Sequence, residues 1–168
     1  NVSGQLGIQD IVIPCVDQSS LVDEIDTMAF VNVIKSLAEK ANAEDVNLSL
    51  ETDLAPRPFA ELLDRIGSQA VTVNYDMGNS ASLGYDPVEE FFAYGDRISD
   101  IHIKDRMQGG GPVVLGEGHC DFDRVFNQIN ESSYSGPLIM QAYRDDEGRV
   151  LFEKQKAWLE DNYGELLQ

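Results

Sequence analysis

Short apolar runs alternate with longer stretches of helical periodicity along this chain. The first run, residues 11–16, is rich in β-branched residues and bounded by polar ones, which is typical of a strand buried on both faces of a parallel sheet. Between residues 21 and 41, apolar residues recur at helical spacing, so a helix is predicted after the strand. The pattern then predicts four more strand–helix pairs. They are strand 46–50 with helix 58–66, strand 70–75 with helix 87–94, strand 98–103 with helix 122–131, and strand 138–142 with helix 150–163.

Five strands, each followed by a helix, predict right-handed crossovers and one parallel sheet. Two architectures contain such a sheet. A doubly wound sheet usually has a glycine fingerprint after its first strand, and residues 16–20 contain no glycine. A barrel places functional groups at the carboxyl ends of its strands, where this chain has its polar residues. The pattern therefore favours an α/β chain that forms part of a (β/α)8 TIM barrel.

Length and charge limit the function classes. The 168 residues, 42% of them hydrophobic, suffice for one core but not for two ordinary domains, so residues 1–168 are expected to form a single domain. A net charge of -18 opposes binding to nucleic acid or anionic lipid. The sequence has neither an apolar stretch near the ~20 residues of a membrane span nor the pattern of a signal peptide. Cys15 and Cys120 lack disulfide or zinc spacing. We expect a cytoplasmic protein that binds neither nucleic acid nor membrane.

Three side chains at predicted strand ends form a candidate metal site. Asp76 follows Glu51 by 25 residues and His102 follows Asp76 by 26, about one strand–helix unit in each case. Parallel neighbouring strands would bring these groups to the same level of the sheet. Two carboxylates and an imidazole suit Mn²⁺ or Mg²⁺ better than a metal that prefers thiolates, and Zn²⁺ and Co²⁺ are alternatives.

Each of the three has a structural alternative. His102 could be a hydrogen-bonded core histidine, and Glu51 could be a rim carboxylate paired with Arg57. Asp76 could cap the turn that follows it, a role compatible with metal binding. The common register on three strands favours the metal site.

Five segments carry a resemblance to a known family: NLSLETDL, VNYDMGNSASLGYDP, ISDIHIKDR, VVLGEGHCDF and YSGPLIMQAYRD. In this order and spacing they resemble the sugar phosphate isomerase/epimerase branch of the xylose isomerase-like barrels, which includes L-ribulose-5-phosphate 3-epimerase and hexulose-6-phosphate isomerase-like proteins. The resemblance runs almost end to end and implies the fourth to eighth strands of the barrel. It also implies one divalent metal held by Glu51, Asp76, His102 and a fourth residue. The fourth position, a glutamate in the family, is Gln141 here.

Gln141 changes the chemistry that the resemblance implies. The family's 3-epimerases use the first and last glutamates as an acid/base pair, but glutamine cannot exchange a proton near pH 7. Its carbonyl oxygen can still bind a metal. Glu51 alone could move a proton between neighbouring carbons of a metal-stabilised enediolate, which is an aldose–ketose isomerisation. Two-base epimerisation would need another acid, and Glu117 in the GEG loop is the candidate.

Four residues are predicted to bind substrate. Lys104 lies two residues beyond His102, on the same face of the strand, where it could contact a substrate oxygen or phosphate or remain a solvated rim charge. Asn79, Arg106 and Glu117 follow the same strand ends and complete the set. The glycines at 109–111 and 116–118 lack the ending of a P-loop, so their loop either receives phosphate or is a flexible connector.

The leading hypothesis is a metal-dependent isomerase or epimerase of a small ketose or sugar phosphate. The second is a carbohydrate-binding or regulatory relative that has lost catalysis with the fourth carboxylate. An abasic-site endonuclease of the same superfamily ranks last, because it needs more histidines than the two present. Barrel closure needs eight strands, so the first three units are missing. We expect a fragment, a truncated gene product, or a chain whose barrel is completed by a homo-oligomer partner or another chain.

Overall fold

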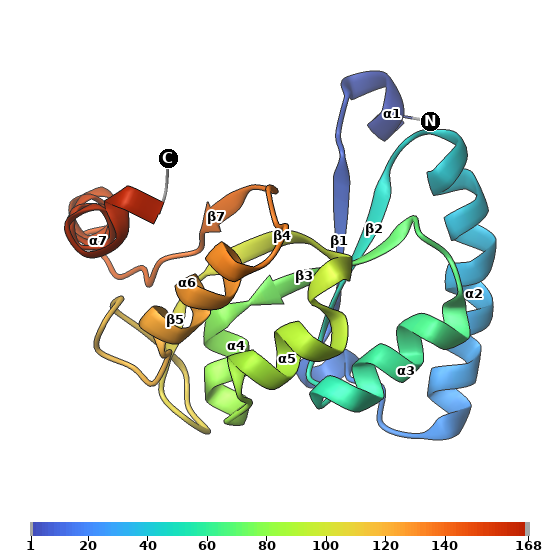
Figure 1. Ribbon diagram of the computed structural model, residues 1–168, viewed down its shortest axis with the longest axis horizontal. Coiled ribbons are helices and arrows are strands. Elements are labelled where there is room, and N and C mark those ends of the chain that lie inside the picture. Colours follow the sequence, from blue (N-terminus) through green and yellow to red (C-terminus); the bar gives the residue numbers. More distant parts are fainter. Residues whose placement is uncertain (1, 167–168) are drawn as a thin grey trace.

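A computed structural model describes residues 2–166 and contains a parallel sheet of five strands within that range (Figure 1). The strands are β1 (Asp10–Cys15), β2 (Asn47–Thr52), β3 (Val71–Asp76), β4 (Ile98–Ile103) and β7 (Leu138–Met140). Their spatial order, β1-β2-β3-β4-β7, is the order in which they occur in the chain, and every pair is parallel. A doubly wound sheet reverses its order at a switch point, so this order is TIM-barrel-like instead. The predicted parallel strands are confirmed.

Besides the short helix α4 (Met77–Leu83), six helices flank the sheet or extend from its ends in the described residues, and each predicted helix is present. They are α1 (Val2–Leu6), α2 (Glu24–Ala43), α3 (Pro56–Ile66), α5 (Pro87–Tyr94), α6 (Phe122–Glu131) and α7 (Arg149–Tyr163). Short 3-10 turns lie at Asp17–Ser19 (η1), Gly95–Arg97 (η2) and Gly164–Leu166 (η3). The predicted cap of α6 is confirmed, since the Asp121 carboxylate accepts a hydrogen bond from the Arg124 backbone N–H at 3.1 Å. No helix within residues 2–166 combines the length and apolarity needed to cross a membrane.

The outer face of the sheet is apolar and packs against helices. Leu50, Val71, Val73 and Ile101 are almost completely buried. Helices α2, α3, α5 and α6 lie on this side of the strands (Figure 1). Burying one such side chain fully stabilises the fold by about 1.5–3 kcal/mol. The core cluster also includes these helix residues: Val31, Ile34, Phe59, Leu62, Leu63, Val125 and Phe126.

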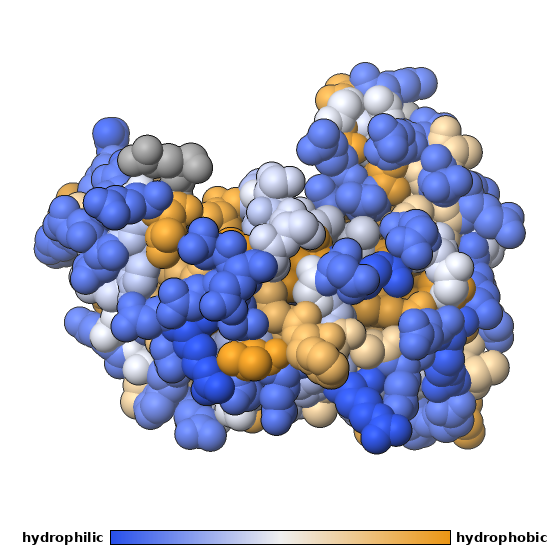
Figure 2. Space-filling model, in the orientation of Figure 1, coloured by the Kyte–Doolittle hydropathy of each residue, from blue (hydrophilic) through white to orange (hydrophobic). Residues whose placement is uncertain are grey.

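The inner face of the sheet is polar. Successive side chains of a strand point to opposite faces, so the residues that alternate with the apolar ones share this side. Ser49 and Asp100 are hydrogen-bonded to each other at 2.9 Å across this face. Figure 2 shows the outline of the molecule hollowed between the N-terminal segment and the C-terminal helix, on the side of the strands opposite α3, α5 and α6. The inner face therefore offers buried polar groups to one side of an open sheet.

Three features differ from the prediction. β1 is not buried on both faces, since Ile11 is 38% exposed, and β1 is an edge strand of the sheet in the described residues. β7 ends at Met140 instead of residue 142. Two elements were not predicted, namely helix α4 (Met77–Leu83) and the antiparallel hairpin of β5 (Asp105–Arg106) and β6 (Pro112–Val113).

Helix α4 begins and ends on local backbone signals. The Asp76 carboxylate accepts a hydrogen bond from the Asn79 backbone N–H at 2.8 Å, which caps the helix. Gly84 ends the helix in the left-handed conformation, with φ at 76°. Seven residues without an apolar period give α4 little periodic signal, so strand-end residues were predicted there instead.

A buried carboxyl group supports the packing of α4 and α5 against β3. Glu90 is 2% exposed and accepts hydrogen bonds from the hydroxyls of Tyr75, Ser80 and Tyr94. Burial raises the pKa of Glu90, and these hydrogen bonds offset only part of the increase. The folded protein therefore binds this proton more tightly than the unfolded chain does.

We predict that the stability difference between the wild type and Glu90→Gln depends on pH. Because the folded pKa is raised, the contribution of the Glu90 carboxyl group is fully present below its unfolded value near 4.5 and is lost as pH rises. Glutamine does not titrate. The free energy of unfolding, measured by urea denaturation, should become larger for Glu90→Gln relative to the wild type as the pH rises from 4.5 to 7.5. An equal difference at both pH values would contradict this assignment.

Candidate metal centre

The structure brings Glu51, Asp76 and His102 together, as their spacing predicts. Each offers a potential ligand atom, and these atoms all lie within 4.8 Å of one another. Asp76 and His102 are paired residues in the β3–β4 register, and Glu51 lies near the end of β2. Opposite ligands of one ion lie about 4.2 Å apart for Mg²⁺ and about 5 Å apart for Ca²⁺. The three groups are therefore spaced closely enough for one divalent ion.

The carboxylate of Glu51 is held by two side-chain amides. Asn79 Nδ2 donates to Oε1, and Asn74 Nδ2 donates to Oε2 at 3.0 Å. The alternative pairing of Glu51 with Arg57 is wrong, because Arg57 instead binds Glu61 one helical turn further along α3, at 2.9 Å. Glu51 is thus oriented by neutral donors and not neutralised by an arginine.

Asp76 caps α4, which is one of the two roles considered for it, and its carboxylate also lies close to Glu51 and His102. Its Oδ2 lies 3.1 Å from Lys104 Nζ and 3.7 Å from His102 Nδ1. Lys104 therefore lies on the same face as His102, as strand alternation predicts. Two carboxylates against one ammonium leave this cluster with a surplus of negative charge when His102 is neutral, which favours a cation.

Burial and charge shift the pKa values of two of these groups. Burial raises the pKa of Glu51, and the neighbouring Asp76 charge raises it further. Burial lowers the pKa of His102, but interactions with Asp76 and with the charges of Glu51 and Asp100 outweigh this effect, so the pKa lies above its ordinary value. A carboxylate with a raised pKa is a stronger base, which suits proton abstraction near neutral pH.

A divalent cation fits these residues on two grounds. The donor set of two carboxylates and one imidazole suits Mn²⁺, Mg²⁺ or Zn²⁺. In addition, the carbonyl oxygen Oδ1 of Asn74, a residue only 2% exposed between Glu51 and His102, has no hydrogen-bond partner in the part of the chain that the structure describes. Buried polar atoms are normally satisfied, so this layer has capacity for a further bound species.

Gln141 lies at the carboxyl end of β7, and its side chain makes no hydrogen bond to this cluster in the described residues. It follows β7 directly, and its backbone N–H donates to the Ile103 carbonyl at 2.9 Å. Its exposed side chain and Lys104 line the same hollow of about 510 Å³ at the carboxyl ends of β4 and β7. Whether the Gln141 amide completes a metal site stays a prediction.

The remaining predicted residues have different surroundings. Glu117 is exposed in a loop whose backbone N–H groups at Gly116, Gly118 and Cys120 bind the buried carboxylate of Asp105. Asn79 and Arg106 are joined to each other, Nη1 of Arg106 donating to Oδ1 of Asn79 at 2.7 Å. The glycine-rich loop is therefore held at its base, and two predicted substrate ligands already have partners inside the protein.

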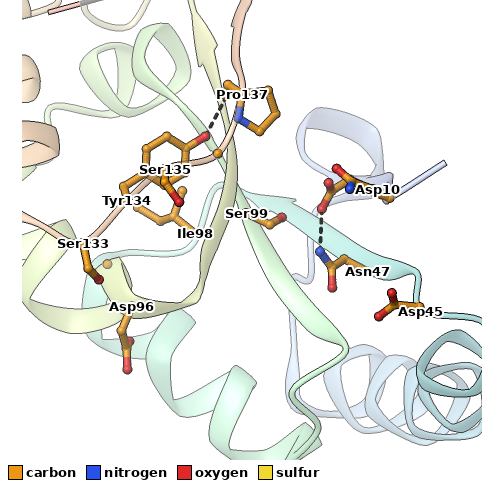
Figure 3. Close-up of a pocket in the computed structure, with 13 residues that line it drawn as sticks. Asp10, Asp45, Asn47, Asp96, Ile98, Ser99, Ser133, Tyr134, Ser135 and Pro137 are labelled. Atoms are coloured by element: carbon orange, nitrogen blue, oxygen red, sulfur yellow. Dashed lines mark hydrogen bonds between the residues drawn. The ribbon is translucent and has the colours of Figure 1, made fainter. Parts of the chain in front are cut away.

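The sequence reasoning missed Asn74, which contacts both Glu51 and His102. It lies two residues before Asp76 on β3, so strand alternation alone places it on the same face. A second hollow, of about 410 Å³, lies at the opposite ends of the strands (Figure 3). There Asn47 donates to Asp10 at 2.9 Å and Tyr134 donates to the Pro137 carbonyl at 2.6 Å. This hollow is separate from the candidate metal centre.

Comparisons with known proteins place this arrangement in a family context. The family model described as xylose isomerase-like TIM barrel matches residues 2–162. The chain is 32% identical over 108 residues to an inosose dehydratase from Geobacillus kaustophilus, an alignment that covers 51% of this chain and 35% of that protein. It is 31% identical over 83 residues to an L-ribulose-5-phosphate 3-epimerase from Salmonella paratyphi A, covering 49% of this chain and 29% of the relative. The matched region thus spans about a third of each relative.

Three solved structures with similar folds contain a metal or a sugar. The IOLI protein with a zinc atom has a TM-score of 0.77 at 18% identity, covering 98% of this chain and 65% of its own. A xylose isomerase-like TIM barrel protein from Mycobacterium smegmatis in complex with magnesium has a TM-score of 0.74 at 16% identity. The alignment covers 99% of this chain and 65% of that protein. The D-allulose 3-epimerase from Methylomonas sp. in complex with D-allulose has a TM-score of 0.69 at 18% identity. The alignment covers 86% of this chain and 53% of that protein. These likenesses show a TIM-barrel-like fold.

We predict that Mn²⁺ stabilises the protein and that Asp76→Asn abolishes most of this effect. An ion at a hundred times its Kd adds about 2.7 kcal/mol to the free energy of unfolding. Asparagine can still cap α4, but it lacks the charge, so Mn²⁺ affinity should fall at least about 100-fold. Thermal unfolding with and without Mn²⁺ measures how much the ion stabilises each protein and how far its affinity falls in the variant.

The matched control is Asp86→Asn. Asp86 also caps a helix, accepting from the Val88 N–H at 2.9 Å, and also pairs with a basic residue, Arg124. This variant should keep the full Mn²⁺ stabilisation. An equal loss of the Mn²⁺ effect in both variants would show that the triad is not the site.

Proposed function

The chain belongs to the xylose isomerase-like TIM barrel family, and from that premise we propose that it is a metal-dependent enzyme that moves a proton between carbons of a small ketose or ketose phosphate. The observation that carries the proposal is the buried meeting of Glu51, Asp76 and His102 near the carboxyl ends of three parallel strands. Barrel enzymes have their active sites at that end of the strands. The sugar isomerases and epimerases among the similar proteins support the substrate class.

Glu51, Asp76 and His102 would hold the ion, with the Gln141 carbonyl oxygen as a fourth ligand. Mn²⁺ or Mg²⁺ suits this mainly oxygen-donor set, and Zn²⁺ or Co²⁺ is the alternative. When bound, such an ion polarises the carbonyl and hydroxyl oxygens of a sugar and makes the adjacent C–H more acidic. Its charge would be received by the carboxylates of Glu51 and Asp76.

Glu51 acts as the base. Its carboxylate takes the proton from the carbon beside the carbonyl group, and the carbon–hydrogen electron pair forms an enediolate. The hydroxyl proton of the first carbon passes to the former carbonyl oxygen, and the same carboxyl group returns its proton to the neighbouring carbon, so that aldose and ketose interconvert with no net change in atoms. The Asn74 and Asn79 amides support this role, because they hold the Glu51 carboxylate in place without cancelling its charge. Lys104 would contact a substrate oxygen or phosphate beside it.

The single carboxylate favours isomerisation over epimerisation. Inversion at one carbon needs an acid on the face opposite Glu51, and Gln141 cannot supply a proton there. Glu117, the other acid considered, lies in an exposed loop held by Asp105. The protein's own ionisable groups therefore suit suprafacial transfer by one base.

Dehydration is a second candidate, favoured by the 32% identity to an inosose dehydratase. It shares the first step, since Glu51 would remove the proton beside the carbonyl group. A hydroxyl then leaves from the next carbon, a carbon–carbon double bond forms, and proton and hydroxide depart as water. One base is sufficient for this sequence, so Gln141 is compatible with it.

We also propose that the five strand–helix units correspond to the fourth to eighth of the family barrel. The alignments with the zinc-containing IOLI protein and the magnesium-containing barrel protein include almost all of this chain. They include about two thirds of each of those proteins. Three further units, from the same polypeptide or a partner chain, would close the sheet between β1 and β7.

We predict that the protein with Mn²⁺ incorporates deuterium from D2O into L-ribulose 5-phosphate or D-allulose, and that Glu51→Gln slows this at least about 1,000-fold. Loss of a catalytic acid or base costs about 10²–10⁴-fold. NMR of the products locates the deuterium: at C1 or C2 for isomerisation, and at C3 for epimerisation. With inosose, loss of water detected by mass spectrometry indicates dehydration. Sugar binding without exchange in any of these would favour the carbohydrate-binding alternative.

We predict that Gln141→Glu leaves the rate of the native one-base reaction within about threefold, because Glu51 already performs both proton transfers. The rate of deuterium incorporation in the two proteins is the measurement. If Gln141→Glu instead gains tenfold or more in exchange at C3, the native protein is an epimerase that lacks its second acid.

A further inference from the structure

Both oxygens of the Glu51 carboxylate accept hydrogen bonds from amide groups. Asn74 belongs to β3 and is fixed by the sheet, but Asn79 belongs to the short helix α4. The Asn79 side chain is mostly buried, at 9% exposure for the residue, and its Nδ2 donates to Oε1 of Glu51. The direction in which this amide points therefore decides whether Glu51 meets a donor or an acceptor.

Arg106 determines that direction. Its Nη1 donates to Asn79 Oδ1 at 2.7 Å, and a guanidinium group has donors only. If the amide rotated by half a turn, its NH2 would face the guanidinium and its oxygen would face the carboxylate. Both contacts would be repulsive. The cation on one side and the anion on the other thus allow one orientation of Asn79.

Arg106 is itself held in place by the hairpin loop. Its Nε and Nη2 donate to the Gly110 carbonyl at 3.0 and 2.7 Å. That loop is tied to α4, because the Gly109 N–H donates to the Ser82 carbonyl at 2.8 Å. A side chain at position 110 would lie 2.9 Å from Met107 Cβ, so the close turn favours glycine. The guanidinium group therefore has a fixed position relative to Asn79.

We propose that Arg106 and Asn79 are positioning residues that orient the Glu51 carboxylate, with Arg106 acting through Asn79. The inference rests on the proposed function, in which Glu51 binds the metal and moves the proton. It replaces the interpretation of these two residues as substrate ligands, since their side-chain hydrogen bonds connect them to each other, to the Gly110 loop and to Glu51.

Charge and positioning make opposite predictions for Arg106→Gln. Removing a cation near a cation site strengthens metal binding if Arg106 acts only through its charge. Removing the group that orients Asn79 weakens binding, because a ligand that is no longer held must be ordered by the metal. Loss of such supporting hydrogen bonds typically costs about 10–100-fold in metal affinity. The sign of the change separates the two explanations.

The test is titration calorimetry of Mn²⁺ into the wild type, Asn79→Ala, Arg106→Gln and the double variant. We expect each single variant to bind Mn²⁺ about tenfold more weakly, and the double variant to bind within about twofold of Asn79→Ala, because one residue acts through the other. Arg106→Lys should lose less than Arg106→Gln, since one donor can still reach Asn79. Tighter or unchanged binding by Arg106→Gln, or additive losses in the double variant, would overturn the inference.

Arg97→Gln is the matched structural control. Arg97 also donates to backbone carbonyls, those of Ser68 and Val71, but it lies just before β4, at the ends of the strands opposite the metal centre. This variant should lose stability in urea and keep the wild-type Mn²⁺ affinity. Circular dichroism confirms folding of every variant, and Asn79→Ala tests the inference if Arg106→Gln fails to fold. A wild type that binds no Mn²⁺ would overturn the proposed function and this inference together, whereas normal wild-type binding with an unaffected Arg106→Gln overturns the inference alone.

Discussion

The parallel register of β2, β3 and β4 is the constraint on which the candidate site depends. Because side chains alternate along each strand, a register that buries Leu50, Val73 and Ile101 against the helices places Glu51, Asp76 and His102 on the other face. A slip of one residue would exchange the two sets, burying carboxylates among apolar side chains. The free energy of burying the outer face therefore also holds the site together.

The inner face collects groups that would be costly to bury alone. The Asp100 carboxylate accepts a hydrogen bond from Ser49, and the Asp76 carboxylate accepts hydrogen bonds from Lys104 and the α4 backbone. The Glu51 carboxylate accepts hydrogen bonds from two side-chain amides. These partners are mostly neutral donors, so they orient the carboxylates without cancelling their charge. The result is a layer with surplus negative charge and an oriented Glu51 carboxylate, a combination that suits both cation binding and proton transfer.

Much of this could be predicted from the sequence, because strand spacing and alternation are simple periodic signals. The separations between Glu51, Asp76 and His102 were sufficient to predict their meeting, and Lys104 followed from alternation. Asn74 could have been found by the same rule. Helix α4 could not, since its cap Asp76 was interpreted mainly as a ligand and its seven residues show no amphipathic period. The exposure of β1 depends on which strands lie beside it, and the contacts of Arg106 depend on a hairpin with two residues in each strand. Such long-range contacts leave no local pattern.

The most direct measurement of the central claim is anomalous diffraction at the manganese edge from crystals of the protein grown with Mn²⁺. The account predicts one strong anomalous peak at about 2.0–2.3 Å from oxygen atoms of Glu51 and Asp76 and a ring nitrogen of His102. A peak bound elsewhere on the molecule, with these three side chains joined only to protein groups or water, would contradict it.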